Sequence, residues 1–150
     1  MQTGLVVLVT VLAASGVFGL LRARRDGVVR ASTPSRGPRD AEPATRLDAT
    51  TLGHPLGERA TLLQFSTAFC QPCRVTRVVL ADVAASEPGV RHIELDAESH
   101  LDLVRRLGIL RTPTVLVLDG EGREVGRATG APRKPQVLEA LAAVPGAARS

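Results

Sequence analysis

The chain has 150 residues, which allows one compact domain and an appendage. Apolar residues make up 44% of the sequence and aromatic residues only 2%, so a core must be built from Val, Leu, Ile and Ala. The formal net charge is +4, and residues 22–46 carry all of it, with seven Arg against three acids. Residues 47–150 balance twelve basic against twelve acidic groups, which argues against a nucleic-acid-binding domain.

The first predicted element is an apolar run over residues 3–21 that contains no charged residue. A helix of that length spans roughly 28 Å, close to the hydrocarbon thickness of a bilayer. A cleaved signal peptide would have basic residues before the run and a small-residue cleavage site after it, but no basic residue precedes the run and arginines follow it. We therefore predict a retained transmembrane helix over residues 3–21 and a single-pass membrane protein.

The arginines after this run predict the orientation of the helix. Arg22, Arg24, Arg25 and Arg30 follow it closely, so the positive-inside rule places the C-terminal side in the cytoplasm. The alternative, a domain on the extracytoplasmic face, stays open. Residues 22–46 are rich in Arg, Pro, Ser and Gly and show no apolar period, which predicts a flexible cationic linker.

After residue 46 the sequence alternates short apolar runs with amphipathic segments. Apolar or alternating runs bounded by turn residues predict strands, whereas apolar residues three and four apart predict helices. The order predicts an α/β domain over residues 47–150, with a central mixed sheet and helices on both faces. Strands are predicted over residues 60–66, 90–96, 114–119 and 123–129, and helices over residues 73–85, 99–109 and 134–144.

The two cysteines of the chain, Cys70 and Cys73, lie between the first predicted strand and the helix that follows it. A zinc site would need four Cys or His ligands, and the histidines at 54, 92 and 100 are scattered along the chain. An iron–sulfur cluster shared by two chains has no support beyond the cysteine pair itself. A structural disulfide across so short a segment would add little to the stability of the fold. A Cys-x-x-Cys pair beside a strand–helix–strand pattern is typical of a redox site, and we expect no metal and no cofactor.

Three landmarks between residues 47 and 144 resemble the thioredoxin family. The stretch FSTAFCQPC, which ends at Cys73, stands where that family has a strand, an aromatic residue and a redox motif that opens a helix. The stretch GILRTPTVLVLDGEGREVGRATG resembles the family's segment with a cis-proline, here Pro113, followed by a hairpin. Gly130 falls where the family commonly has a glycine after the last strand. The resemblance implies the thioredoxin fold.

The resemblance implies that Cys70 attacks a substrate disulfide and that Cys73 resolves the mixed disulfide. A cysteine at the start of a helix faces unpaired N–H groups and the positive end of the helix dipole, which stabilise its thiolate. In the family the cis-proline lies across from the reactive sulfur, and the backbone of the residue before it pairs with the substrate. The residues expected to bind substrate are Phe69, Gln71, Pro72, Thr112, Pro113 and Gly130.

The sequence departs from the family at three places. Phe69 replaces the usual Trp, Gln64 replaces the buried acid of the preceding strand, and His92 replaces the lysine that pairs with that acid. Gln64 cannot accept a proton at neutral pH, so the proton of Cys73 must leave by another route. We hypothesise that His92 or water accepts it; the alternative is that His92 is only a tolerated polar residue in a strand.

These features predict a membrane-anchored thiol–disulfide oxidoreductase that reduces or exchanges disulfides in protein substrates. Its expected partners are dithiol or disulfide proteins and an electron-donating reductase or thiol pool. We expect it to act in cell redox homeostasis and not to bind nucleic acid. The alternative is a redox-linked binding or chaperone module that holds partners in the groove at Pro113 with little turnover.

Overall fold

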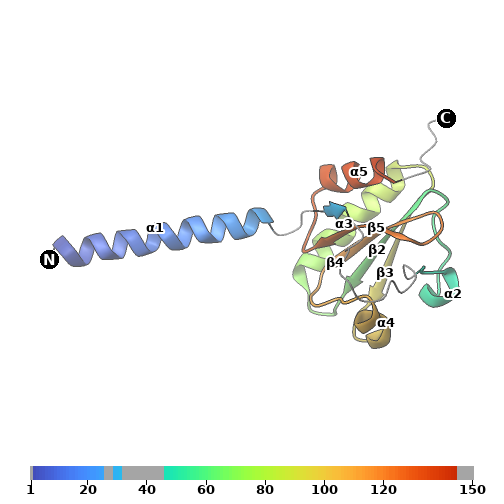
Figure 1. Cartoon of the computed structure of the whole chain (residues 1–150), viewed down its shortest axis with the longest axis horizontal. Coiled ribbons are helices and arrows are strands. Elements are labelled where there is room, and N and C mark those ends of the chain that lie inside the picture. Colours follow the sequence, from blue (N-terminus) through green and yellow to red (C-terminus); the bar gives the residue numbers. More distant parts are fainter. Residues whose placement is uncertain (1, 26–28, 32–45, 145–150) are drawn as a thin grey trace, which may run out of the picture.

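The computed structural model of the chain describes residues 2–25, 29–31 and 46–144. All four predicted strands and all three predicted helices of the domain are present, with small shifts of their ends. Figure 1 shows their arrangement around one sheet. The elements are α1 (Gln2–Arg25), β1 (Val29–Ala31), α2 (Ala49–Leu52), β2 (Ala60–Ser66), α3 (Gln71–Ser86), β3 (Val90–Asp96), α4 (Leu101–Arg106), β4 (Thr114–Asp119), β5 (Glu124–Thr129) and α5 (Lys134–Ala142).

The sheet is mixed, as the sequence predicted, and its strand order is β1-β5-β4-β2-β3. Strand β2 pairs in parallel with β3 and antiparallel with β4, and β5 pairs antiparallel with both β4 and β1. The parallel pair follows from the crossover through α3, whereas the β4–β5 pair is a hairpin. The carboxyl end of β2, where the redox motif begins, therefore lies beside the end of β3.

Strand β1 was not predicted, and it lies inside the segment predicted to be a linker. It has only three residues and pairs with β5 through Arg30 and Arg127 at its centre. A strand of three residues is too short to show a period of two, and backbone pairing needs no particular side chain. Residues 22–25 of the predicted linker instead continue the helix α1, and its residues 26–28 and 32–45 lie outside the described residues.

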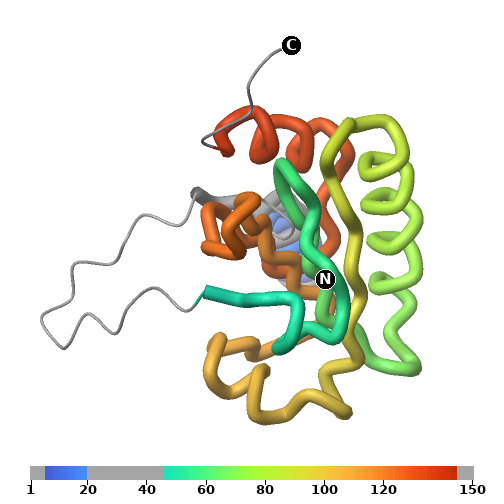
Figure 2. Tube along the Cα trace, turned by 90° about the vertical axis from the view of Figure 1, so that its right-hand side faces the viewer, coloured from blue at the N-terminus to red at the C-terminus, as the bar shows by residue number. Residues whose placement is uncertain are grey.

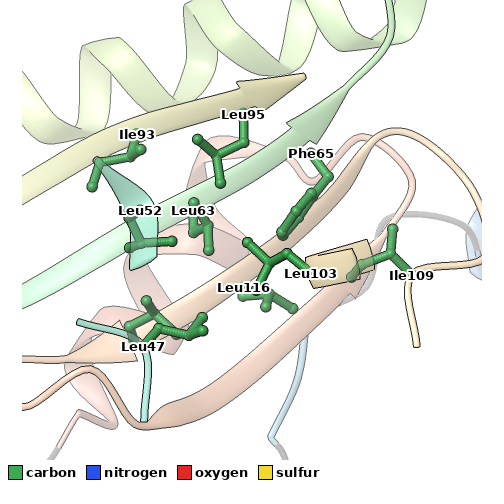
Figure 3. Close-up of a cluster of buried hydrophobic side chains, with 10 residues drawn as sticks. Leu47, Leu52, Leu63, Phe65, Ile93, Leu95, Leu103, Ile109 and Leu116 are labelled. Carbon is green, nitrogen blue, oxygen red and sulfur yellow. The ribbon is translucent and has the colours of Figure 1, made fainter. Parts of the chain in front are cut away.

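Each face of the sheet carries its own hydrophobic cluster, because successive side chains of a strand point to opposite faces. On one face, Leu80 and Val83 of α3 and Val137 and Leu141 of α5 pack on β2, β4 and β5. Figure 2 shows α3 as a separate layer beside the strands. On the other face, α2 and α4 cover the sheet. The cluster there, drawn in Figure 3, includes Leu47, Leu52, Leu63, Phe65, Ile93, Leu95, Leu103, Ile109 and Leu116.

The predicted single-pass membrane localisation is wrong. Among the described residues, no helix combines the length and the apolar character that a membrane crossing requires. The orientation inferred from the positive-inside rule depended on that span and loses its basis.

Candidate functional site

The two cysteines form a disulfide at the start of α3. Their sulfur atoms lie 2.05 Å apart and their Cα atoms 5.2 Å apart. Cys70 is the residue before the first helical one, and its Sγ accepts a hydrogen bond from the backbone N–H of Cys73 at 3.2 Å. Cys70 is partly exposed, whereas Cys73 is only 1% exposed. The disulfide therefore offers one accessible sulfur, that of Cys70, at the positive end of a helix.

Helix α3 begins at this position because the residues there suit the first turn of a helix. Pro72 lies in that turn, where its missing N–H costs no hydrogen bond. The hydroxyl of Thr76 donates to the carbonyl of Pro72 at 2.9 Å. Cys73, Thr76, Leu80 and Val83 are buried at spacings of three and four residues, so one face of the helix packs on the sheet. This packing holds Cys73 inside while Cys70 stays at the rim.

The loop before β4 lies beside the redox motif. The Thr112–Pro113 peptide bond is cis, as the resemblance implied. The hydroxyls of Thr112 and Thr67 lie 3.3 Å apart, and the backbone N–H of Cys70 donates to the carbonyl of Thr67 at 3.3 Å. Gly130 donates its N–H to the carbonyl of Pro113 at 2.8 Å. A chain of hydrogen bonds thus joins Gly130, the cis-proline loop and the cysteine segment.

Thr67 was missed by the sequence analysis, because no local pattern pairs it with a residue 45 positions away. The three predicted contact residues next to the cysteines point outward. Phe69 is 99% exposed, and Gln71 and Pro72 are exposed as well. Phe69, which stands in place of the family's Trp, therefore does not cover the disulfide in this structure.

Gln64 is fully buried behind the disulfide and is held by several hydrogen bonds. Its Nε2 donates to the carbonyl of Cys73 at 2.9 Å and to the hydroxyl of Ser66 at 2.8 Å. Its Oε1 lies 3.2 Å from Nε2 of His92. An amide oxygen can only accept, so His92 carries a proton on Nε2 in this arrangement and can accept one only at Nδ1. Gln64 and His92 are thus brought together, and Gln64 alone of the two contacts Cys73.

A pair of oppositely charged side chains, missed by the sequence analysis, adjoins this network. Arg77 of α3 donates from Nη2 to Oε1 of Glu94 on β3 at 2.9 Å, and from Nε to Oε2 at 2.5 Å. Oε1 of Glu94 also lies 3.5 Å from Nε2 of Gln64. The two residues are 17 positions apart, and only the packing of α3 on β3 makes them neighbours.

Burial and charge shift the pKa values of this group of residues. Burial lowers the pKa of His92 below its ordinary value of 6.5; Glu94 opposes this shift, and Arg77 adds to it. Burial alone would raise the pKa of Glu94, but hydrogen bonds from Arg77 and Ser66 outweigh it, so the pKa lies below the ordinary 4.5. At neutral pH the imidazole is therefore uncharged and the carboxyl group is ionised.

A pocket of about 300 Å³ opens beside the disulfide. Its walls are the segment 66–68, both cysteines, Arg74 and Arg77 of α3, and Glu94 and Asp96 of β3. Among the described residues, no three His, Cys, Asp or Glu side chains are grouped to hold a metal ion.

Comparisons with known proteins agree with this geometry. A family model described as a thioredoxin-like domain matches residues 54–145. Thioredoxin H4-1 of Oryza sativa subsp. japonica is 30% identical over 86 residues, which are 57% of this chain and 64% of the rice protein. A thioredoxin of Alicyclobacillus acidocaldarius is 32% identical over 89 residues, 59% of this chain and 84% of that protein.

The fold is also similar to solved structures. The short form of thioredoxin f from spinach chloroplast superimposes with a TM-score of 0.52 at 29% identity, over 59% of this chain and 78% of that one. The chain thus spans somewhat less than two thirds of the rice relative and a larger share of the others.

Proposed function

Because the chain belongs to the thioredoxin-like domain family, we propose that it is a thiol–disulfide oxidoreductase that reduces or exchanges disulfides in protein substrates. The observation that carries this proposal is the Cys70–Cys73 disulfide at the start of α3, with one sulfur accessible and the other buried. Such a pair supplies one attacking and one resolving thiol at a fixed separation, which is what disulfide exchange requires.

The geometry supports an exchange in two steps. In the reduced protein the Cys70 thiolate, stabilised by the helix N-terminus, attacks one sulfur of a substrate disulfide and releases the other as a thiolate. Cys73 then attacks the Cys70 sulfur of the mixed disulfide, which releases the second substrate thiolate and forms the disulfide of this structure. Two electrons pass to the substrate, and a reductase or thiol pool must return them to the protein.

The surface around Cys70 supplies the proposed substrate-binding residues. Thr112, Pro113 and Gly130 are joined to the cysteine segment by hydrogen bonds, so a peptide laid along them would lie next to the accessible sulfur. Phe69, Gln71 and Pro72 flank Cys70 with exposed side chains that a partner could cover. The exposed ring of Phe69 favours apolar contacts with such a partner.

Insulin reduction tests this proposal against a redox-linked binding or chaperone module. With dithiothreitol as electron donor and insulin in large excess, we expect each protein molecule to reduce many insulin molecules, measured as precipitation of the free B chain. A single equivalent of reduction, followed by a stable complex, would contradict the enzyme and support the binding module.

We propose that His92 accepts the proton of Cys73 through water during the resolving step. Replacing His92 with Gln should slow resolution of a preformed mixed disulfide by about tenfold at pH 7. The pKa of His92 lies below its ordinary value of 6.5. In the native protein the resolving rate should therefore fall as the pH is lowered from 6.5 past this pKa, because a protonated imidazole cannot accept a proton. Stopped-flow measurements from pH 5 to 8 would show this dependence. In the variant the rate should instead rise steadily with pH over the whole range, because Cys73 must then ionise without a base.

The exposed His54 provides the matched control, since its replacement with Gln makes the same chemical change away from the disulfide. The His54→Gln protein should keep the native rates at every pH. Equal resolving rates in the His92→Gln and native proteins between pH 6 and 8 would leave His92 as a polar strand residue that only holds Gln64.

A further inference from the structure

The pocket beside the disulfide is large enough to admit a small molecule. Its volume of about 300 Å³ lies at the lower end of the range for small-molecule sites. Both cysteines form part of its wall, so a molecule inside it lies next to the disulfide. The pocket lies on the side of the disulfide where α3 meets β3, whereas the proposed peptide surface is built on the loop at Pro113.

The charged groups of the pocket differ in whether they are already hydrogen-bonded within the protein or remain available to a ligand. Both oxygens of Glu94 are held by Arg77. The oxygens of Asp96 accept hydrogen bonds from the backbone N–H of Glu98 at 3.1 Å and from the hydroxyl of Ser99 at 2.6 Å. The two acids are therefore already hydrogen-bonded within the protein.

Arg74 is the exception among these charges. It is exposed on the first turn of α3, next to Cys73, and it has no hydrogen-bond or ion-pair partner among the residues that the structure describes. A guanidinium group carries five N–H donors in a planar fork that fits a carboxylate. The formal charges of the pocket sum to zero, with Arg74 and Arg77 against Glu94 and Asp96, so the unused donors of Arg74 decide what binds.

We propose that the pocket receives the carboxylate of a low-molecular-weight thiol or disulfide, which Arg74 holds while the sulfur of that molecule reacts with Cys70. The inference rests on the proposed exchange chemistry of the cysteine pair. It adds a second class of substrate, small carboxylate-bearing disulfides, to the protein disulfides that the surface at Pro113 would hold.

The reaction balances without any further reagent. The reduced protein attacks a small disulfide RSSR through the Cys70 thiolate, which forms a Cys70–S–S–R bond and releases one RS⁻. Cys73, after losing its proton through water to His92, attacks the Cys70 sulfur and releases the second RS⁻. The protein loses two electrons and the small disulfide gains them. In the opposite direction, two thiols RSH reduce the disulfide of this structure and yield RSSR.

Three small disulfides that differ in charge test the proposal on the full-length protein. These are dithiodipropionate, which carries carboxylates, hydroxyethyl disulfide, which is neutral, and cystamine, which carries ammonium groups. Each is mixed in excess with the reduced protein, and loss of the free thiols is followed by alkylation and mass spectrometry. Each rate is divided by the rate at which the same compound reacts with dithiothreitol, an uncharged thiol, because the three leaving thiols differ in pKa. We expect dithiodipropionate to react about fivefold faster than the neutral compound at low salt, and cystamine to react no faster than the neutral one.

Substitutions at two exposed arginines locate the effect. Arg74→Gln should abolish the fivefold preference, and Arg74→Lys should keep part of it. The neutral compound reports any change in the Cys70 thiolate itself, because it has no charge for Arg74 to hold. Arg91→Gln removes the same charge from an exposed site on β3 outside the pocket and should leave the preference unchanged.

The outcomes separate this inference from the proposed function. Equal rates with the carboxylate and neutral compounds, a fastest reaction with cystamine, or a preference that survives Arg74→Gln would overturn the carboxylate site and leave exchange at Cys70 intact. No reaction with any of the three compounds would overturn the proposed exchange function, and the carboxylate site with it.

Discussion

Replacing Cys70 with Ser is expected to lower the rate of insulin reduction by roughly a thousandfold or more. A serine hydroxyl does not ionise at neutral pH, so the variant has no thiolate at the N-terminus of α3 to attack a substrate disulfide. Cys73 cannot take over this role, because it is 1% exposed and faces the protein interior beside Gln64. The measurement is the initial rate of insulin precipitation with dithiothreitol as donor, corrected for the rate without protein.

The Cys73→Ser variant is the matched control, because it makes the same atomic change at the other sulfur. It keeps the attacking thiol and lacks the resolving one, so it should form a mixed disulfide with insulin that persists until external reductant cleaves it. Non-reducing electrophoresis and intact-protein mass spectrometry would detect that adduct. Equal insulin turnover in the Cys70→Ser and native proteins would refute the assignment of Cys70 as the attacking residue.

Replacing Phe65 with Ala is expected to lower the free energy of unfolding by about 3–5 kcal/mol. Phe65 is fully buried in β2, and its ring packs in the cluster under α4, as Figure 3 shows. The substitution leaves a cavity that the surrounding Leu and Ile side chains cannot close without moving the sheet. Because a domain of this size is stable by only about 5–15 kcal/mol, urea unfolding should show a much lower midpoint.

Phe69→Ala provides the control for this prediction. It makes the identical chemical change four residues later, but at a side chain that is 99% exposed. Its free energy of unfolding should stay within about 0.5 kcal/mol of the native protein, since no buried contact is lost. If Phe65→Ala proved as stable as Phe69→Ala, the described core of β2 would be wrong.

The central sheet was predictable because its elements have local signals. The apolar runs of β2 and β4 and the amphipathic pattern of α3 each lie within one short window of sequence, and burial follows directly from such patterns. The position of the redox pair was also readable, since a strand before it and a helix after it are local features. The N-terminal apolar run correctly predicted a helix, which is α1. The membrane localisation predicted from the same run was wrong, because apolar composition does not by itself establish a membrane span.

What the sequence by itself determined is therefore the set of elements, the α/β class and the pair Cys70 and Cys73 at the start of a helix. The tertiary structure alone decided which distant side chains meet at that pair. The contacts of Arg77 with Glu94 and of Thr67 with Thr112 join residues 17 and 45 positions apart. The pocket beside Arg74, a residue with no hydrogen-bond or ion-pair partner in the described part of the chain, also forms only after folding. The physical reason is that such contacts depend on how α3 and the loop before β4 pack around the sheet. That packing cannot be inferred from any short stretch of the sequence.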